Sequence, residues 1–340
     1  MTDAPPEKIL LIQFRQLGDV LLTSPAARVL KDNYPGAKVD FLTQPPCGQA
    51  LAGNPWIDEV LLYDKSAPLR WLAEVRRRRY DLVVDFMSTS RSALVSFFSG
   101  ARLRAGPAYT SSSWAYNRKL RRAPGQSDYT SFFKAELLGQ LGLEKIGRYL
   151  PQFSPSPADG AWAAEQAAAL GLAGSPFVAF SPASRRITRQ WPAEHFAALA
   201  RRLAEEKGLP SLFFWGPGEK ELCVRIAALS GTPLARPAPE TATVGRLAAM
   251  FRLSRLLVSN CNGAKHVAQA AGVSTVGIYG ASRPENWTPP GDPRHQFIRN
   301  EALDCIGCGS HECAVGIRCL RDLSPEAVFA KLSPMLDKAA

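Results

Sequence analysis

The sequence has no long hydrophobic run and no secretion signal at its start. No uncharged apolar stretch reaches the roughly 18–20 residues that a transmembrane helix needs. The start carries Asp3 and Glu7, and the apolar run behind them, residues 9–14, is short and contains Gln13. Because a signal peptide needs a basic start and a longer apolar core, we expect the protein to stay in the cytoplasm.

Motifs of several common enzyme classes are missing as well. The chain contains no Walker A sequence, no HExxH, no GxSxG and no GxGxxG, so none of these motifs assigns it to a known enzyme class. Acidic residues are comparatively few, since 30 Asp and Glu stand against 41 Lys and Arg. The net charge of +11 suggests an anionic partner such as nucleic acid, a phosphorylated ligand or a membrane surface. A merely solvated basic surface is the alternative interpretation.

Length and composition are those of a two-domain globular protein. The chain has 340 residues, of which 46% are hydrophobic and 21% charged, and a domain averages about 150 residues. Short apolar strands alternate with helical stretches, which predicts parallel sheets covered by helices on both faces. We therefore expect an α/β protein of two doubly wound domains that face one interdomain cleft.

The domain boundaries follow from a break in this alternation. Residues 149–160 contain three prolines and two serines, a composition typical of a linker. We predict an N-terminal domain over residues 1–150, a linker over 151–160, a second domain over 161–323 and a C-terminal helix over 324–340.

Three segments carry more detailed expectations. Leu17–Asn33 is predicted as one helix, and Ala105–Ser127, rich in Ser, Tyr and Arg, as an irregular loop. The last helix is expected to have Ser324 as its N-cap, followed by Pro325 at its first position. In doubly wound sheets ligands bind at the carboxyl ends of strands, so the residues after each strand are the candidates for function.

The first such segment contains Arg15, Gln16, Gly18 and Asp19. It follows the first predicted strand and opens a helix, where glycine permits close backbone approach and the helix start favours anions. Asp19 would then be a carboxylate at the edge of the sheet, where a general base can act. The alternative is that Asp19 only caps the first turn of the helix.

Two loops of the second half have the composition of a nucleotide site. Ser184 and Arg189 lie on a loop with several arginines between a strand and a helix, which suits a diphosphate. Glu219 and Glu221 follow the next strand in a glycine-bearing turn, where a carboxylate can bind ribose hydroxyls. An exposed basic loop and ordinary acids at a helix start are the alternatives.

A third loop, after a strand that ends at Ser259, contains Asn262, Gly263 and His266. Backbone N–H groups at the start of the following helix can cradle a phosphate, and Lys265 or His266 can add positive charge. A purely structural histidine is the alternative.

Four of the seven cysteines lie close together near the end of the chain. Four thiolates at such short spacing fit a tetrahedral structural zinc site, although the spacing differs from that of common zinc fingers. An iron–sulfur cluster, free thiols and a local disulfide remain alternatives. The four residues are Cys305, Cys308, Cys313 and Cys319.

Taken in succession, these motifs resemble glycosyltransferase family 9, the heptosyltransferases of lipopolysaccharide core assembly. The resemblance runs from about residue 8 to 335. It is carried by KILLIQFRQLGDVLLTSPAARVLKDNYPGAKVDFLT, RQWPAEHF, WGPGEKE, SNCNGAKHVAQAAG, GASRPENWTPP and the cysteine-rich tail.

The resemblance implies a GT-B architecture, with two Rossmann-like domains around a cleft, the acceptor on the first and the nucleotide-sugar on the second. It implies inverting transfer of a heptose from an ADP-sugar to an anionic, lipid-linked saccharide, with no cofactor required for catalysis. The protein would act in the cytoplasm, in peripheral contact with the inner membrane, and would not bind nucleic acid.

The resemblance also assigns roles to individual residues. Asp19 matches the family's general base, and Gly263 and His266 match its phosphate-binding turn. The remaining matches are Ser184 and Arg189 toward the diphosphate, the latter in place of a Lys, and Glu219 or Glu221 toward the ribose.

One position departs from the family pattern. Cys261 stands where the family often has an Asp linked to donor or divalent-ion contact, and a neutral thiol cannot replace a carboxylate toward Mg²⁺. Two alternatives follow: a nucleotide-sugar-binding protein without transfer activity, and a transferase with a different nucleotide-sugar donor.

Overall fold

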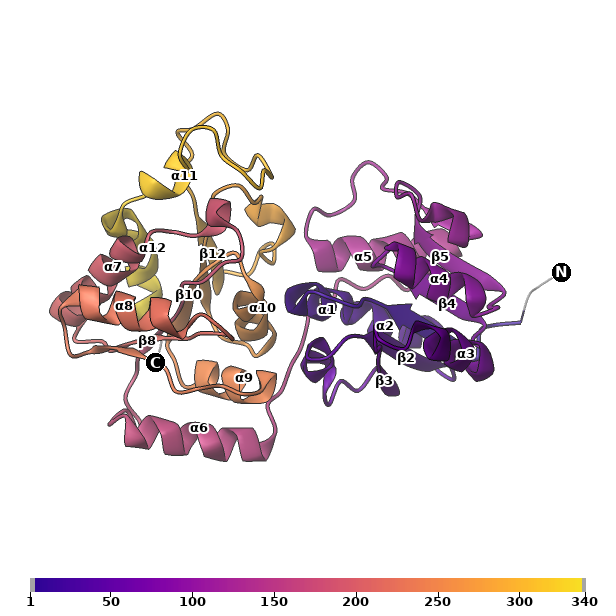
Figure 1. Ribbon diagram of the computed structural model, residues 1–340, viewed down its shortest axis with the longest axis horizontal. Helices are drawn as coiled ribbons and strands as arrows, with labels where there is room; N and C mark the ends of the chain where they lie inside the picture. Colours follow the sequence, from indigo (N-terminus) through magenta and orange to yellow (C-terminus); the bar gives the residue numbers. More distant parts are fainter. Residues whose placement is uncertain (1–3, 338–340) are drawn as a thin grey trace. The chain divides into compact units, whose positions relative to one another are not determined.

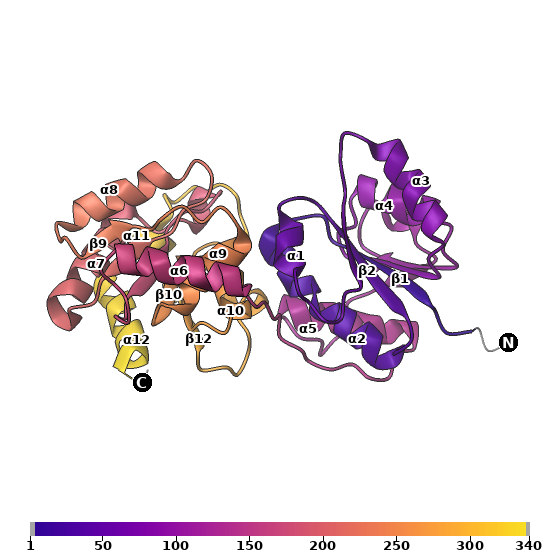
Figure 2. The same cartoon turned by 90° about the horizontal axis from the view of Figure 1, so that it is seen from below.

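The computed structural model describes residues 4–337. The chain divides into two compact units, residues 1–153 and 154–340, and Figures 1 and 2 show that each unit is a sheet with helices packed against it. Within residues 4–337 no helix is both long and apolar enough to cross a membrane.

The first unit contains a six-stranded sheet in which neighbouring strands run parallel. The strands lie in the order β3-β2-β1-β4-β5-β6. Their bounds are β1 (Lys8–Ile12), β2 (Lys38–Thr43), β3 (Glu59–Leu62), β4 (Leu82–Asp85), β5 (Leu103–Pro107) and β6 (Arg118–Leu120).

Both faces of this sheet are covered by helices. Successive side chains of β1 point to opposite faces of the sheet, and each set contacts a different group of helices. Ile9 and Leu11 pack with residues of α1, α2 and α5, whereas Leu10 and Ile12 pack with residues of α3 and α4. A strand buried on both faces has to be apolar throughout, as the sequence KILLI is. The helices are α1 (Leu17–Thr23), α2 (Pro25–Asn33), α3 (Pro68–Arg78), α4 (Ser90–Phe98) and α5 (Thr130–Leu138).

The second unit repeats this topology. Its six parallel strands lie in the order β12-β11-β10-β7-β8-β9, which is the same winding counted from β7. The strands are β7 (Val178–Ser181), β8 (Ser211–Phe213), β9 (Ala235–Pro237), β10 (Leu256–Asn260), β11 (Thr275–Ile278) and β12 (His295–Ile298).

Helices of the second unit enclose a large apolar core. Val178, Phe180 and Val258 of the sheet pack with Phe196 of α7 and Leu332 of α12. The helices are α6 (Pro157–Ala169), α7 (Ala193–Lys207), α8 (Lys220–Ser230), α9 (Val244–Arg252), α10 (Gly263–Ala270), α11 (Arg318–Arg321) and α12 (Pro325–Asp337).

The division between the units falls inside the predicted linker, but part of that linker is helical. Helix α6 begins at Pro157, and the hydroxyl of Ser156 accepts a hydrogen bond from the backbone N–H of Asp159. A serine N-cap followed by proline is a strong helix start. The linker composition that we recognised is therefore partly a capping signal.

Two further expectations need correction. The predicted helix Leu17–Asn33 is two helices, α1 and α2, because Pro25 has no N–H to continue the hydrogen-bond ladder. The segment Ala105–Ser127 is not irregular throughout: it contains most of β5 and all of β6. Only Leu120 of the three residues in β6 is buried, so this strand has no apolar run that reveals it.

The final helix has its predicted cap, with Ser324 Oγ accepting from Ala327 N.

The winding of each sheet reverses between two central strands, β1 and β4 in the first unit and β7 and β10 in the second. Ligands of doubly wound sheets bind at the carboxyl ends of the strands on either side of such a reversal. Four loops are therefore the places to examine, and they contain most of the residues singled out in the sequence.

Candidate functional site

Asp19 lies in the first turn of α1, directly after β1. Its Oδ2 accepts a hydrogen bond of 3.3 Å from the backbone N–H of Gln16, the N-cap of the helix. The capping interpretation is thus correct for one oxygen. Within residues 4–337 no hydrogen bond is seen to Oδ1, and the residue is half-buried. One carboxylate oxygen therefore remains available for a substrate.

A buried lysine that the sequence did not reveal lies near this carboxylate. Lys134 of α5 donates to Gln13 Oε1 (2.9 Å) and to Thr23 Oγ1 (2.6 Å). The hydroxyl of Thr23 in turn donates to the backbone oxygen of Asp19 (2.6 Å). Burial lowers the pKa of Lys134 to about 8, and the charge of Asp19 opposes that shift.

A cavity of about 460 Å³ opens at the carboxyl ends of the first four strands. Its lining carries three cations, Arg15, Lys65 and Arg91, and polar groups such as Gln44 and Thr89. A concave surface with three convergent cations suits a ligand with more than one anionic group. Of the predicted loop residues, Arg15 lines this cavity.

The loop between β4 and α4 is organised by a second group that the sequence did not reveal. Asp85 is fully buried, and it accepts hydrogen bonds from Met87 N (2.9 Å), Ser88 N (2.9 Å) and Tyr116 Oη (2.8 Å). Burial raises its pKa to about 6, while these donors act in the opposite direction. Asp85 thereby shapes the loop whose next residues line the cavity.

In the second unit, two asparagines join the loops after β7 and β10. Asn260 Oδ1 accepts from Trp191 N (3.1 Å), and its Nδ2 donates to Pro182 O. Asn262 caps α10 by accepting from Lys265 N (3.2 Å), and its Nδ2 donates to Ser181 Oγ (2.8 Å). The side chain of Asn262, a predicted ligand contact, is thus engaged within the protein. Its neighbourhood offers backbone N–H groups instead.

Gly263 begins α10, and His266 is buried one turn further along. Burial and the charge of Lys265 hold the pKa of His266 well below its usual value. His266 is therefore neutral at pH 7 and can offer a hydrogen bond but no charge. Lys265 is fully buried, and its Nζ donates to Trp287 O (2.5 Å). Burial lowers the pKa of Lys265 to about 8, so Lys265 and not His266 carries positive charge at pH 7, and its ammonium group is directed to the Trp287 carbonyl.

Three buried polar atoms on the loops of this sheet edge have no hydrogen-bond partner within residues 4–337. They are Nε of Arg189, Nδ1 of His266 in the first turn of α10, and Oγ of Ser282; the other buried atoms of this kind in the same range belong to Ser96, His195, Ser211 and Gln269. These residues follow β7, β10 and β11 respectively. Buried polar groups in proteins are nearly always paired, so three such atoms at the edge where ligands bind indicate a site for a polar ligand.

The other predicted donor residues surround this edge. Ser184 is half-buried, and its Oγ accepts from Arg186 N at 3.4 Å. Glu219 is the N-cap of α8, and its Oε2 accepts from Gly216 N (2.8 Å). Glu221 is exposed in the first turn of α8. Of the two acids, Glu219 is the one whose position is fixed by its loop.

The cysteine-rich segment is hydrogen-bonded to the same edge. Gly307 N donates to Gly280 O (3.1 Å), Gly309 N donates to Ala281 O (2.7 Å), and Ser310 O accepts from Thr188 Oγ1 (3.0 Å). Thr188 immediately precedes Arg189. The segment therefore supports the loops that carry Arg189 and Ser282.

The four thiols do not form a metal cage as they are placed. Burial raises the pKa of Cys319, and the other three cysteines raise it further, so the thiols are neighbours. Within residues 4–337, however, no group of three or more His, Cys, Asp or Glu side chains is arranged to hold a metal ion. The zinc site remains a prediction from the spacing, which elemental analysis of protein purified under reducing conditions tests.

Comparison with known proteins gives this geometry a context. Residues 69–317 match Glycosyltransferase family 9 (heptosyltransferase). Lipopolysaccharide heptosyltransferase 3 of Escherichia coli is 26% identical over 82% of this chain and 85% of its own length. Lipopolysaccharide heptosyltransferase 2 of E. coli K12 is 24% identical over 97% of this chain and 98% of its own.

Solved structures show the same fold. A glycosyl transferase family 9 protein from Veillonella parvula superposes with a TM-score of 0.83 at 23% identity, covering 98% of both chains. The E. coli ADP-heptose lps heptosyltransferase II superposes with a TM-score of 0.80 at 24% identity, covering 97% of this chain and 99% of its own. The expected GT-B fold, built of two Rossmann-like units, is confirmed.

Proposed function

The chain belongs to glycosyltransferase family 9 (heptosyltransferase), and from this premise we propose that it transfers a heptose from an ADP-sugar to a hydroxyl of a lipopolysaccharide-core saccharide. The second unit would bind the donor and the first unit the acceptor. The observation that carries the proposal is the set of three unpaired buried polar atoms, on Arg189, His266 and Ser282, at the ligand-binding edge of the second sheet.

A nucleoside diphosphate satisfies these groups. The guanidinium of Arg189 supplies the charge for the diphosphate, and the start of α10, at Gly263, adds the partial positive charge of a helix N-terminus. Ser184 lies on the loop before Arg189 and contributes a hydroxyl. Glu219 accepts a ribose hydroxyl at the adjacent strand end.

The cationic cavity of the first unit supports an anionic acceptor. Arg15, Lys65 and Arg91 line one concave surface, and arginine binds carboxylates and phosphates through two parallel hydrogen bonds. An acceptor of this class is lipid-linked, so the protein would work in the cytoplasm at the inner-membrane surface.

Asp19 is the proposed general base of an inverting reaction. Its free oxygen takes the proton of the acceptor hydroxyl while that hydroxyl oxygen attacks the anomeric carbon. The bond between the anomeric carbon and the diphosphate oxygen breaks in the same step, and the electron pair leaves with ADP. A single displacement inverts the configuration and needs one base and no covalent intermediate.

The test combines Asp19→Asn with calorimetric titration of ADP, GDP and UDP. The variant removes the base and keeps the shape of the side chain, so transfer falls by about 10²–10⁴-fold while the affinity for ADP stays within about twofold of wild type. Transfer falls because the proton acceptor is lost. ADP affinity is kept because Asp19 lies in the first unit and the proposed donor edge in the second.

Other results would assign the site differently. Unchanged transfer by Asp19→Asn rules out Asp19 as the base. Selective binding of UDP or GDP keeps the reaction type and replaces the ADP-sugar with another donor. Arg189→Gln is the matched variant in the donor site, since it removes the charge and weakens ADP binding.

Cys261 favours one alternative function, a nucleotide-sugar-binding protein without transfer activity. The residue is buried, directly after β10 and before the capping Asn262, at the position where the family often has an acid. Selective ADP binding without any transfer by the wild-type protein would support this alternative.

A further inference from the structure

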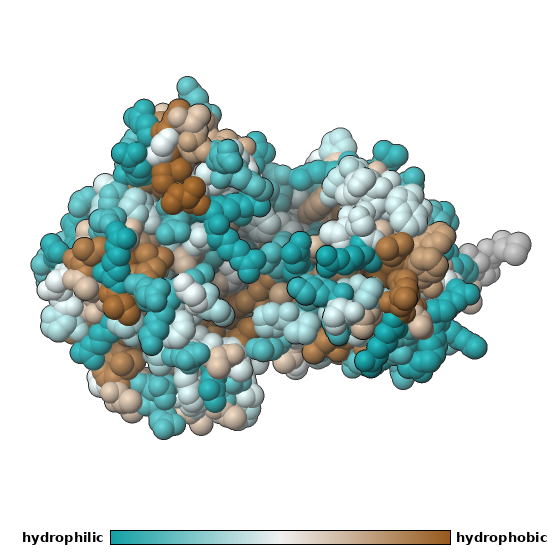
Figure 3. All heavy atoms as spheres, viewed as in Figure 1, coloured by the Kyte–Doolittle hydropathy of each residue, from teal (hydrophilic) through white to brown (hydrophobic). Residues whose placement is uncertain are grey.

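Helix α4 carries an apolar face that the first unit leaves exposed. Leu94, Phe97 and Phe98 are three and four residues apart, so they share one face of the helix. With Trp114 they form what we call the α4 patch. Phe97, Phe98 and Trp114 are 45%, 48% and 54% exposed, although large aromatic side chains are usually highly buried on average. Figure 3 shows brown side chains over α4 on this face of the molecule.

The patch is one continuous surface. The ring centroids of Phe97 and Phe98 are 5.4 Å apart, as are those of Phe97 and Trp114. The guanidinium of Arg104 lies 5.8 Å from the ring centroid of Phe97, which links the aromatic group to its basic surroundings. The three rings and the Arg104 guanidinium are therefore neighbours on one surface.

The chain segment that contains the patch carries charge of one sign. Residues 86–127, which form α4, β5 and β6, contain seven Arg and Lys and no Asp or Glu. Arg122 forms an ion pair with Asp128, just outside this segment. Four exposed cations of the segment form no ion pair within residues 4–337: Arg91, Arg118, Lys119 and Arg121.

We propose that the α4 patch and the cations around it dock this protein on the surface of an anionic lipid bilayer. Exposed Phe and Trp side chains insert their rings at the level of the lipid headgroups, where amphipathic aromatics are favoured. The cations meet the phosphates of anionic lipids, each contributing about 1 kcal/mol near the surface. A segment with no acidic residue has the charge that complements such a surface.

The position of α4 would bring a docked membrane close to the cationic cavity. The start of α4 lines the cationic cavity with Thr89, Ser90 and Arg91. The helix ends at Phe98, which belongs to the patch. A helix rises 1.5 Å per residue, so about 12 Å separates the two ends. A saccharide anchored in the bilayer under the patch can therefore reach the cavity. This access of the saccharide to the cavity rests on the proposed function, whereas the docking itself does not.

The experiment measures binding of the full chain to vesicles by sedimentation. Vesicles of phosphatidylcholine with about 30% phosphatidylglycerol are compared with phosphatidylcholine alone, at about 0.1 M and about 1 M salt. We expect binding to the anionic vesicles at low salt, and weaker binding in each of the other three conditions.

Two variants separate the parts of the surface. Phe97→Ser with Phe98→Ser weakens binding to anionic vesicles by about tenfold, because two apolar rings no longer insert. Arg118→Gln with Lys119→Gln and Arg121→Gln weakens it by about fivefold for each cation removed.

The matched control lies in the second unit. Val224 and Leu229 of α8 are 46% and 43% exposed, so changing both to Ser removes two exposed apolar side chains outside the α4 patch and leaves vesicle binding unchanged. Circular dichroism and thermal unfolding of every variant verify that the chain is folded.

Several outcomes would overturn the proposal. These are no binding of wild type to anionic vesicles, equal binding to neutral vesicles, and two sets of variants that bind like wild type. Dimers of the wild type that Phe97→Ser with Phe98→Ser dissociates would assign the α4 patch to a second copy of the chain. Transfer to a deacylated acceptor without vesicles reads out the proposed function separately, so the two ideas can fail independently.

Discussion

At the scale of a single residue, the burial of Lys134 depends on tertiary packing. A lysine in the middle of a helix is normally solvated, as Lys145 is after the end of α5, but Lys134 is buried. Its environment consists of Gln13 from the end of β1 and Thr23 from α1, residues more than 110 positions away along the chain. Only the packing of α5 against α1 makes Lys134 a neighbour of Asp19.

Lys134→Met is expected to change how stability depends on pH. The folded-state pKa of about 8 lies below the unfolded value of 10.5, so between these values the unfolded chain binds more protons. Stability of the wild type relative to the variant therefore rises by about 3 kcal/mol as the pH increases from 8 to 10.5. Urea denaturation of both proteins at several pH values measures this difference.

The exposed Lys145 supplies the control for this prediction. Lys145→Met removes a lysine whose side chain is exposed, and its stability is measured alongside. Parallel stability profiles of wild type and Lys134→Met across the alkaline range would show that Lys134 is not buried as described.

His266 and Asp19 show how far sequence reasoning goes for single residues. Both lie at strand ends, where the apolar strand before them and the glycine beside them predict a ligand-binding turn. The sequence does not predict their protonation state or hydrogen bonds. Burial makes His266 neutral, and a capping hydrogen bond engages one oxygen of Asp19. Such states depend on neighbours that come from other elements.

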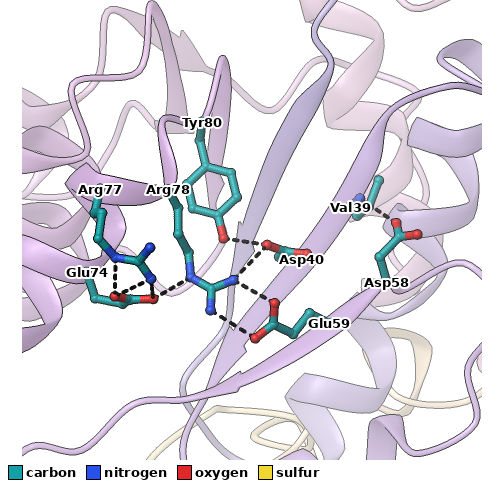
Figure 4. A network of polar contacts seen from close by, with 8 residues as sticks. All are labelled: Val39, Asp40, Asp58, Glu59, Glu74, Arg77, Arg78 and Tyr80. Atoms are coloured by element: carbon teal, nitrogen blue, oxygen red, sulfur yellow. Dashed lines mark hydrogen bonds and ion pairs between the residues drawn. The ribbon is translucent and has the colours of Figure 1, made fainter.

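At the scale of elements, α3 is held against the sheet by a polar network (Figure 4). Arg78 at the end of α3 contacts Glu59 of β3 (2.6 Å), Glu74 of α3 (2.8 Å) and Asp40 of β2 (3.4 Å). Asp40 is buried, and Tyr80 Oη also donates to it (2.6 Å). Burial raises the pKa of Asp40, whereas the hydrogen bonds from Arg78 lower those of Glu59 and Glu74.

Arg78→Met is expected to destabilise the protein by about 2–4 kcal/mol at pH 7. Most of this comes from Asp40, which is left buried without its cationic partner. Glu59 is half-exposed, so its own pair contributes little. The depressed pKa values of Glu59 and Glu74 mean that their contribution is present above pH 4.5 and is lost as the pH falls below it. Chemical denaturation at pH 7 and pH 4 measures both effects.

Arg77→Met is the matched control for this prediction. The Arg77 side chain is 73% exposed and pairs only with Glu74 among the described residues, so its loss costs no more than about 0.5 kcal/mol. Equal destabilisation by both variants would mean that the network does not hold α3 in place.

The elements themselves were unequally predictable. Strands such as β1, β7 and β10 are buried on both faces and read as short apolar runs. Edge strands such as β6 and β9 have three residues each and include charged side chains. A strand of that kind exists because a neighbouring strand offers it hydrogen bonds, and a neighbouring strand is not a property of its own sequence.

At the scale of the whole molecule, the chain is built as two units with separate cores. The apolar clusters of residues 1–153 and those of residues 154–340 have no member in common, so each unit is a candidate for independent unfolding. Since the proposed donor edge belongs entirely to the second unit, ADP should stabilise that unit directly.

Calorimetry should accordingly resolve two unfolding transitions. ADP at about 100 times its Kd raises the stability of one unit by about 2.7 kcal/mol, and hydrogen exchange should show the protected amides after β7, β10 and β11. Protection centred on the loop after β1 would place the nucleotide in the first unit and contradict the proposed division of roles.

The sequence by itself determined the family, the two doubly wound units and the loops at the carboxyl ends of their strands, because apolar strands, glycine turns and capping residues are local signals. Tertiary structure alone decided which groups on those loops are paired, neutral or buried, since these properties depend on residues brought together from distant positions. Lys134 beside Asp19, the unpaired atoms of Arg189 and Ser282, and the exposed rings on α4 are all of this second kind. They arise from packing between elements, and such packing produces no recognisable pattern in the sequence of either packed element.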